Sequence, residues 1–126
     1  MMPLPTEIIE LDFGIIEFYE NYMITTSIEG VTLTEKNVSQ IQSYASAFYK
    51  DKSFGYISYR VNDYSRNISP KSYTRQFPKL LAFAIVCKTE FSLDIANFEK
   101  FFIKVPFKTF KNLNSAKEWM LKETEK

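Results

Sequence analysis

The 126-residue chain has no histidine, one cysteine and three glycines. The missing histidine removes the commonest general base and the commonest metal ligand, and it excludes Ser–His and Cys–His catalysis. The lone thiol, Cys87, excludes an internal disulfide and a thiolate zinc site. No glycine-rich turn of the kind that cradles phosphates is present either. We therefore expect a fold held by packing alone, with no catalytic residue, no metal and no cofactor.

Long apolar runs are also scarce. The longest one covers residues 80–87, which is far too short to cross a bilayer. The first eight residues lack the basic and apolar regions of a signal peptide, and a single cysteine suits a reducing compartment. These features predict a cytoplasmic protein without membrane insertion.

The charges are unevenly distributed, although the net charge is only +1. Residues 1–35 contain seven acids and no Lys or Arg, whereas residues 36–126 contain all sixteen bases and eight acids. Such asymmetry indicates either interaction surfaces or internal pairing, and we favour pairing because opposite charges in one domain neutralise each other's far field. A nucleic-acid binder of this size usually has a clear basic excess, so we expect no nucleic-acid partner.

The N-terminal third has the pattern of strands followed by a helix. Alternating and β-branched residues predict an antiparallel meander of three strands at residues 7–13, 15–19 and 22–28. Thr32 and Glu35 have the spacing of a capping box, which predicts a helix over residues 35–50. Its apolar residues fall on one face: Val38, Ile41, Ala45 and Phe48.

After this helix, strands and helices alternate. The pattern predicts strands at residues 54–61, 80–87 and 106–110, and helices at residues 69–77, 89–102 and from 115 onward. Residues 80–87 are continuously apolar, which is typical of a central parallel strand buried on both faces. The order predicts the α/β class, with a single mixed sheet in which an N-terminal antiparallel meander precedes alternating helices and strands. Without repeats or linkers, we expect a single domain over residues 1–126.

Aromatic residues make up 17% of the chain, more than we expect the core to hold, so some tyrosines should be exposed. Within the predicted helix 89–102, four apolar residues repeat at helical spacing: Phe91, Ile95, Phe98 and Phe102. We expect four rings near the end of the chain to pack against the sheet: Phe101, Phe102, Phe107 and Phe110. We interpret Cys87, at the end of an apolar run, as a small core residue rather than a reactive thiol.

One polar segment stands out as a candidate site, and it consists of Asn62, Asp63, Tyr64, Ser65 and Arg66. It follows the predicted strand 54–61 and precedes a helix N-terminus, where open α/β sheets bind ligands and backbone amides accept an anion. A solvated connection is the alternative, because Asn, Asp and Ser are common turn formers. As a binding site, the segment is expected to be an exposed loop on a rigid scaffold.

Three stretches have a familiar pattern: FGYISYRVNDYS at residues 54–65, LLAFAIVCK at 80–88 and PFKTFKNLNSAKEWM at 106–120. Together they resemble the SpoIIAA-like branch of the STAS fold, especially small uncharacterised proteins of the Bacteroidetes type. The last stretch is similar to the strand, turn and A-x-x-W ending common in that branch. The resemblance extends from about Glu7 to the end of the chain and implies a STAS/SpoIIAA-like fold.

The resemblance also implies a small cytoplasmic module that binds a protein or a small ligand and is open to switching by phosphorylation. Anti-sigma-factor antagonists of this fold place a phosphorylatable serine in an Asp-Ser-Ser/Thr-Gly pattern after a central strand. The matching place here is Asp63-Tyr64-Ser65, where Tyr64 intervenes and no glycine follows. Ser65 is therefore the candidate phosphorylation site.

The leading hypothesis is a non-enzymatic, regulatory interaction module. Its partner protein contacts residues 62–66 or the adjacent helix that begins at Pro70. The alternative is a carrier of a small apolar or anionic ligand, held between sheet and helices among the surplus aromatic residues. An enzyme ranks third, and the sequence carries no indication of the oligomeric state.

Overall fold

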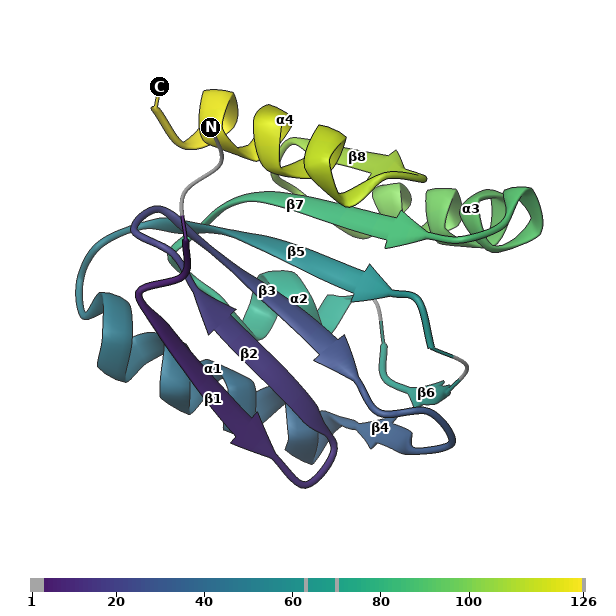
Figure 1. The fold of residues 1–126 in the computed structure, drawn as a ribbon, viewed down its shortest axis with the longest axis horizontal. Helices are drawn as coiled ribbons and strands as arrows, with labels where there is room; N and C mark the ends of the chain where they lie inside the picture. The colour runs from purple at the N-terminus through teal and green to yellow at the C-terminus, as the bar shows by residue number, and fades with distance from the viewer. Residues whose placement is uncertain (1–3, 63, 70, 126) are drawn as a thin grey trace.

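The computed structural model describes residues 4–62, 64–69 and 71–125, which form a mixed six-stranded sheet with helices on both faces (Figure 1). In spatial order the strands are β1 (Glu7–Leu11), β2 (Gly14–Phe18), β3 (Tyr22–Ser27), β5 (Phe54–Arg60), β7 (Leu80–Cys87) and β8 (Phe107–Phe110). The first three strands pair antiparallel, and the strands from β3 to β8 pair parallel. The predicted α/β class, with a meander followed by a parallel part, is confirmed.

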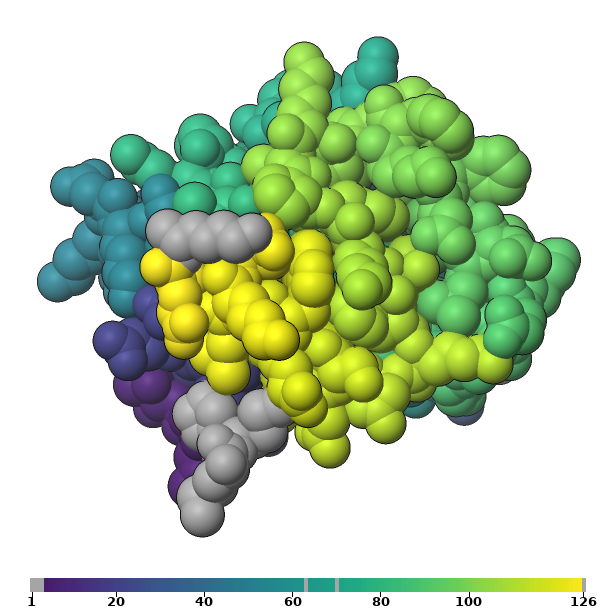
Figure 2. Space-filling view, turned by 90° about the horizontal axis from the view of Figure 1, so that it is seen from above, coloured from purple at the N-terminus to yellow at the C-terminus, as the bar shows by residue number. Residues whose placement is uncertain are grey.

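Three helices connect neighbouring parallel strands: α1 (Glu35–Tyr49), α2 (Lys71–Gln76) and α3 (Glu90–Asn97). Every one of these crossovers steps in the same direction along the sheet, so right-handed connections place all three helices on the same face. The C-terminal helix α4 (Leu113–Glu125) covers the opposite face, and Figure 2 shows it in yellow beside the green segments that precede it. None of the helices in the described part of the chain is long and apolar enough to span a membrane.

The core has one layer on each side of the sheet. Side chains of α1, α2 and α3 pack on one face, including Val38, Tyr73 and Ala96, while Ala116 and Met120 of α4 pack on the other. Seven of the eight side chains of β7 are buried, as the continuous apolar run predicts. Cys87, at the end of this strand, is 2% exposed and belongs to the core, as expected.

Helix α4 lies very close to the sheet because Gly55 of β5 has no side chain. A Cβ atom at this position would lie 2.2 Å from the Sδ atom of Met120 and 3.1 Å from the Cγ2 atom of Thr124. Both the glycine and the flexible methionine are therefore required for this contact.

The first helix is capped differently from the prediction. Thr34, not Thr32, is the N-cap, and it forms the capping box with Asn37 instead of Glu35. The hydroxyl of Thr34 accepts a hydrogen bond from the Asn37 amide, and the Asn37 side chain accepts one from the Thr34 amide. The predicted cap was wrong because residue 32 belongs to a strand, β4 (Thr32–Thr34).

The expected polar loop at residues 62–69 contains a short strand, β6 (Ser65–Asn67), which pairs in parallel with β4. Three polar residues carry too little alternation to indicate a strand, so this two-stranded sheet was missed. Asp63 and Pro70 lie outside the described residues.

The expected continuous helix at residues 89–102 is instead α3 followed by a single 3-10 turn, η1 (Phe98–Phe101). Its apolar residues are largely exposed, with Phe91 at 74%, Phe98 at 66% and Phe101 at 72%. Only one side of this segment faces β7 and β8, and Ala96 and Ile103 fill that contact. The prediction that Phe101 and Phe102 pack on the sheet was therefore wrong, whereas Phe107 stacks on Phe83 of β7.

The acidic and basic parts of the chain pair much less than expected. Among the described residues one ion pair joins them, between Glu35 and Arg75 at 3.6 Å. Five acids of the first three strands and their connections are exposed and form no ion pair within 4.0 Å: Glu7, Glu10, Asp12, Glu20 and Glu29. The charge asymmetry therefore persists on the surface, with acids at the β1 side of the sheet.

Candidate functional site

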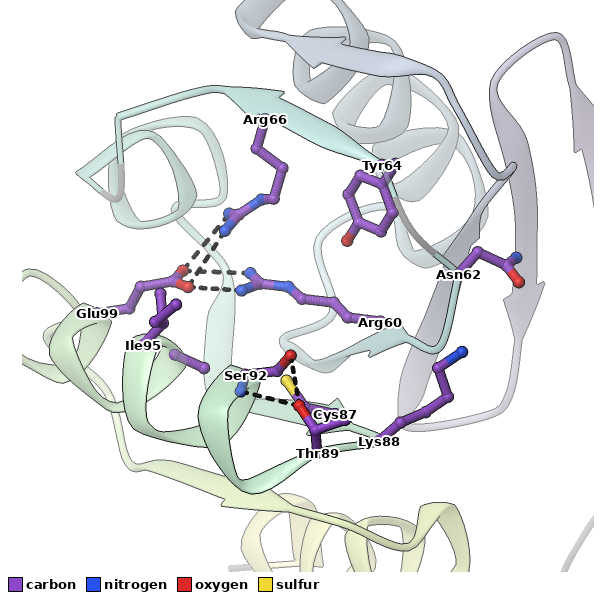
Figure 3. Close-up of a pocket in the computed structure, with 11 residues that line it drawn as sticks. Arg60, Asn62, Tyr64, Arg66, Cys87, Lys88, Thr89, Ser92, Ile95 and Glu99 are labelled. Carbon is purple, nitrogen blue, oxygen red and sulfur yellow. Dashed lines mark hydrogen bonds and ion pairs between the residues drawn. The ribbon is translucent and has the colours of Figure 1, made fainter.

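A pocket of about 310 Å³ lies at the carboxyl ends of β5 and β7 (Figure 3). Arg60 and Cys87, the last residues of these two strands, are partners in the parallel register. Helix α3 begins directly after β7, so its first turn and η1 form the opposite wall of the pocket. This is the edge of the sheet that the sequence indicates.

The strand β6 brings Arg66 into the same pocket. Pairing of β6 with β4 holds residues 65–67 beside the sheet, and the Ser65 amide donates a hydrogen bond to the Val31 carbonyl at 2.9 Å. Figure 3 shows Arg60 and Arg66 extending from different strands toward the same carboxylate, that of Glu99 on η1. Two distant strands and a 3-10 turn thus meet through three charged side chains.

Glu99 is the centre of this charged cluster and is 7% exposed. Arg60 binds it in a bidentate manner, with Nη1 to Oε2 at 2.5 Å and Nη2 to Oε1 at 3.2 Å. Arg66 adds a bond from Nη1 to Oε2 at 3.2 Å. Two guanidinium groups therefore share one buried carboxylate, which leaves a positive excess in a partly desolvated place.

Neighbouring polar groups hold both arginines in place. The Nε atom of Arg60 donates to the Ser58 hydroxyl at 2.9 Å, and Nη2 of Arg66 donates to the Tyr73 hydroxyl at 2.7 Å. The guanidinium of Arg66 also lies over the Tyr73 ring, 5.6 Å from its centroid. Nε of Arg66 is also buried, and no described residue accepts a hydrogen bond from it.

The cluster keeps its charges at neutral pH. Burial raises the pKa of the Glu99 carboxyl, but the charges of Arg60 and Arg66 and their hydrogen bonds outweigh it, so this pKa is lowered. Burial lowers the pKa of Arg60, and the Glu99 carboxylate more than reverses that effect. The site thus offers fixed positive charge and N–H donors, which suit the binding of an anion better than proton transfer.

The residues of the predicted binding loop have different environments. The Asn62 side chain donates to the Ser27 carbonyl at 2.8 Å, and Tyr64 lines the pocket, where burial raises its pKa. Arg66 belongs to the charged cluster, so its side chain is not the exposed one that the sequence suggests. Ser65 is exposed on β6 and, as a strand neighbour of Arg66, faces the other way. The structure thus brings Asn62, Tyr64 and Arg66 to the pocket and directs Ser65 away from it.

Sequence reasoning missed Arg60 and Glu99. Their separation of 39 positions leaves no local spacing to detect. One indication was present, because Arg60 ends a strand of mainly apolar and aromatic residues. A charged residue in such surroundings tends to be buried with a partner.

The remaining chemistry of the pocket is limited. Burial raises the pKa of the Cys87 thiol, which therefore stays protonated and weakly nucleophilic. Across residues 4–62, 64–69 and 71–125, no three His, Cys, Asp or Glu residues are grouped so as to hold a metal ion.

Comparison with known proteins identifies the architecture. A crystal structure of an uncharacterized protein of the DUF3478 family from Shewanella loihica PV-4, described as having a SpoIIAA-like fold, superposes with a TM-score of 0.56. The match covers 83% of this chain and 90% of that protein. This chain has a SpoIIAA-like fold. The sequence identity is 15%, so the likeness concerns the fold alone.

The SpoIIAA-like fold confirms the architecture implied by the sequence resemblance. No family model matches the chain, and no curated protein matches it.

Proposed function

We propose that this protein is a non-enzymatic, regulatory interaction module of the cytoplasm that binds a partner protein. The observation that carries the proposal is a surface between α2 and η1 on which exposed phenylalanine rings lie among cations. We call it the docking surface and define it by Lys71, Thr74, Arg75, Phe101, Phe102 and Lys104, which line a hollow of about 460 Å³.

Exposed aromatic rings support a binding role for this surface. Phe101 is 72% exposed and Phe102 is 41% exposed, and Phe98 on the same turn is 66% exposed. Single exposed apolar side chains are common, but a group of large ones on one short segment is typical of an interaction site. Phenylalanine side chains of this kind supply much of the binding energy when a partner covers them.

The charges of the docking surface favour an acidic partner segment. Among its described lining residues are three cations, Lys71, Arg75 and Lys104, and no acid. Lys100 adds a fourth cation beside the ring of Phe101, with its Nζ atom 5.6 Å from the ring centroid. An acidic segment that also carries an apolar anchor matches both the cations and the rings. We therefore name an acidic, partly apolar segment of a partner protein as the occupant.

The hollow also offers a polar contact. The Thr74 hydroxyl is buried and has no hydrogen-bond partner among the described residues. A buried hydroxyl without a partner is unfavourable, and a bound segment that supplies a polar atom would remove this penalty. The sequence analysis expects the partner at residues 62–66 or at the helix that follows them. The docking surface includes that helix, α2, and its other side is formed by η1 and not by residues 62–66.

The test is co-purification of the full chain, expressed with an affinity tag in its native cells. The double variant Lys71→Glu, Lys104→Glu cancels the positive charge of the docking surface, and Lys122→Glu on α4 is the control on the other side of the sheet. We expect a stoichiometric partner that binds the wild type and the control alike, and the double variant roughly tenfold or more weakly. Cross-linking should map an acidic segment of that partner to Phe101 and Phe102.

Two outcomes contradict the proposal. One is a stoichiometric partner that the double variant retains with unchanged affinity. The other is an absence of any partner combined with self-association of the purified chain, measured by analytical ultracentrifugation and abolished by the double variant. In that case the occupant is a second copy, which would place its acidic β1 side on this surface.

A further inference from the structure

The described lining of the charged pocket contains more basic than acidic side chains. Its described lining includes three cations, Arg60, Arg66 and Lys88, and one acid, Glu99. Arg60 and Glu99 are each about 10% exposed at the side chain, so water screens this imbalance poorly. A bound anion would balance the excess, and nothing in the fold itself requires two guanidinium groups on one carboxylate.

The hydrogen-bond donors of the pocket are incompletely used. The buried Nε atom of Arg66 has no partner in the described part of the chain, although the remaining nitrogens of that side chain contact Glu99 and Tyr73. In Figure 3 the hydroxyl end of Tyr64 points toward Arg60, and the Lys88 side chain extends on the side of Asn62, away from Glu99. These donors line the same pocket, as expected where an oxyanion binds.

The size and the walls of the pocket limit the ligand to a small molecule. The volume of about 310 Å³ is at the lower end for ligand sites. Ile95, Ala96 and Cys87 provide an apolar wall beside the charged one. The pocket therefore fits an oxyanion group attached to a short, partly apolar body.

Glu99 occupies the position that such an oxyanion would take. Its carboxylate fills the fork of Arg60 and contacts Arg66, as a free carboxylate or phosphate would. It lies on a single 3-10 turn whose neighbouring side chains, Phe98 and Lys100, are exposed. Little packing on its outer side opposes a shift of this turn.

We propose that this pocket binds a small molecule through a phosphate or carboxylate group, which Arg60 and Arg66 hold in competition with Glu99. This inference gives the ligand-carrier alternative a definite chemistry, anionic at the charged wall. It does not depend on the docking surface, because no residue that lines this pocket belongs to that surface.

The chain itself supplies a control, because it has three arginines: Arg60, Arg66 and Arg75. The experiment titrates the isotope-labelled full chain with sodium phosphate, sodium acetate or sodium chloride at constant ionic strength and records the arginine Nε–Hε NMR signals. We expect saturable shifts of Arg60 and Arg66 with phosphate, acetate or both, and no saturable shift of Arg75. A response to phosphate alone identifies a phosphate ligand, and a response to acetate alone a carboxylate ligand.

Two variants sharpen the measurement. Glu99→Gln removes the competing carboxylate, so phosphate or acetate should bind about tenfold more tightly and should raise the melting temperature of this variant more than that of the wild type. Arg66→Met should weaken binding at least tenfold, whereas Lys122→Met on α4, outside both proposed sites, should leave it unchanged. If Glu99→Gln does not fold, the wild-type titration and Arg66→Met still decide the question.

The proposal is overturned if neither phosphate nor acetate shifts Arg60 and Arg66 beyond the effect of chloride. It is also overturned if all three arginines respond equally, because that result indicates general screening rather than a site. An Arg66→Met variant that binds both anions with wild-type affinity has the same consequence.

Discussion

The strand β7 and the segment formed by α3 and η1 follow each other in the chain and are both rich in apolar residues, yet they have opposite exposures. Ala84 and Phe83 of β7 are inaccessible to solvent, whereas Phe91 and Phe98 are mostly exposed. The strand has helices on both of its faces, while the α3–η1 segment contacts the sheet with one side and water with the other. Apolar side chains therefore form a core only where a second layer covers them, and elsewhere they remain available to a partner.

The largest effect is expected for Ala84→Asp in β7. Ala84 is 0% exposed, so the new carboxylate would be buried without a partner, at a cost of several kcal/mol against a total stability of about 5–15 kcal/mol. We expect this variant to be unfolded, as measured by circular dichroism and a thermal melt. A native melting curve would contradict the burial of β7 on both faces.

A smaller loss is expected for Glu99→Gln, which breaks the contact between η1 and the two arginines. Removing one partner of a buried ion pair destabilises a protein by about 3–5 kcal/mol, and we expect the lower end because a neutral amide remains. Urea unfolding at pH 7 measures this loss. A change below about 0.5 kcal/mol would mean that the cluster does not anchor η1.

The loss of stability in Glu99→Gln, relative to the wild type, should depend on pH. The pKa of Glu99 is lower in the folded chain than its ordinary value of 4.5, so the folded state holds this proton less tightly than the unfolded state. The stabilisation is therefore complete above about pH 5 and is lost as the pH falls through the folded pKa. Urea unfolding from pH 7 to pH 3 should show the difference between wild type and variant shrinking only at the acidic end. A difference that shrinks toward alkaline pH would contradict the assignment.

A moderate effect is expected for Gly55→Ala on β5, below helix α4. The added methyl group would approach Met120 Sδ to 2.2 Å, so the Met120 side chain or α4 must shift, and overpacking of this kind costs about 1–3 kcal/mol. Chemical denaturation measures the free energy of unfolding of Gly55→Ala and of Gly30→Ala. At Gly30 an added methyl group would meet no atom within 4 Å, but φ is 85°, so that variant tests backbone strain without a close contact. The double variant Gly55→Ala, Met120→Ala should recover part of the loss if the contact is the cause.

The smallest effect on stability is expected for Phe98→Ser on η1. This ring is 66% exposed, so its loss should change the free energy of unfolding by less than about 0.5 kcal/mol. The matched variant Phe83→Ala in β7 should lose about 3–5 kcal/mol under the same conditions. Equal losses for the two variants would show that the α3–η1 rings belong to the core.

The central strands were predictable because their pattern depends on local composition. A continuous apolar run such as residues 80–87 requires cover on both faces, and this decides the place of β7 in the sheet. The short pair of β4 and β6 was not predictable, since three polar residues form a strand only when distant residues come alongside. The exposure of Phe98 was not predictable either. Helical spacing shows which residues share a face of the helix, but it does not show what covers that face.

The candidate site was predictable in place but not in composition. Arg66 and Tyr64 do lie at the carboxyl edge of the sheet that the order of strands indicates. Arg60, Cys87 and Glu99 join them through the parallel register of β5 with β7 and through the fold of η1. These contacts depend on tertiary packing, so local sequence patterns do not predict them.

The uneven charge also affects how the open edges of the sheet behave toward other copies. The edge strand β1 exposes Glu7 and Glu10, and the edge strand β8 exposes Lys108. Charged residues on edge strands oppose the addition of further strands from a neighbouring molecule. Two β1 edges repel through their glutamates and two β8 edges through their lysines, so each edge is protected from its own kind. This protection weakens as salt shortens the Debye length, and high ionic strength is therefore the condition under which like edges of this sheet most readily join.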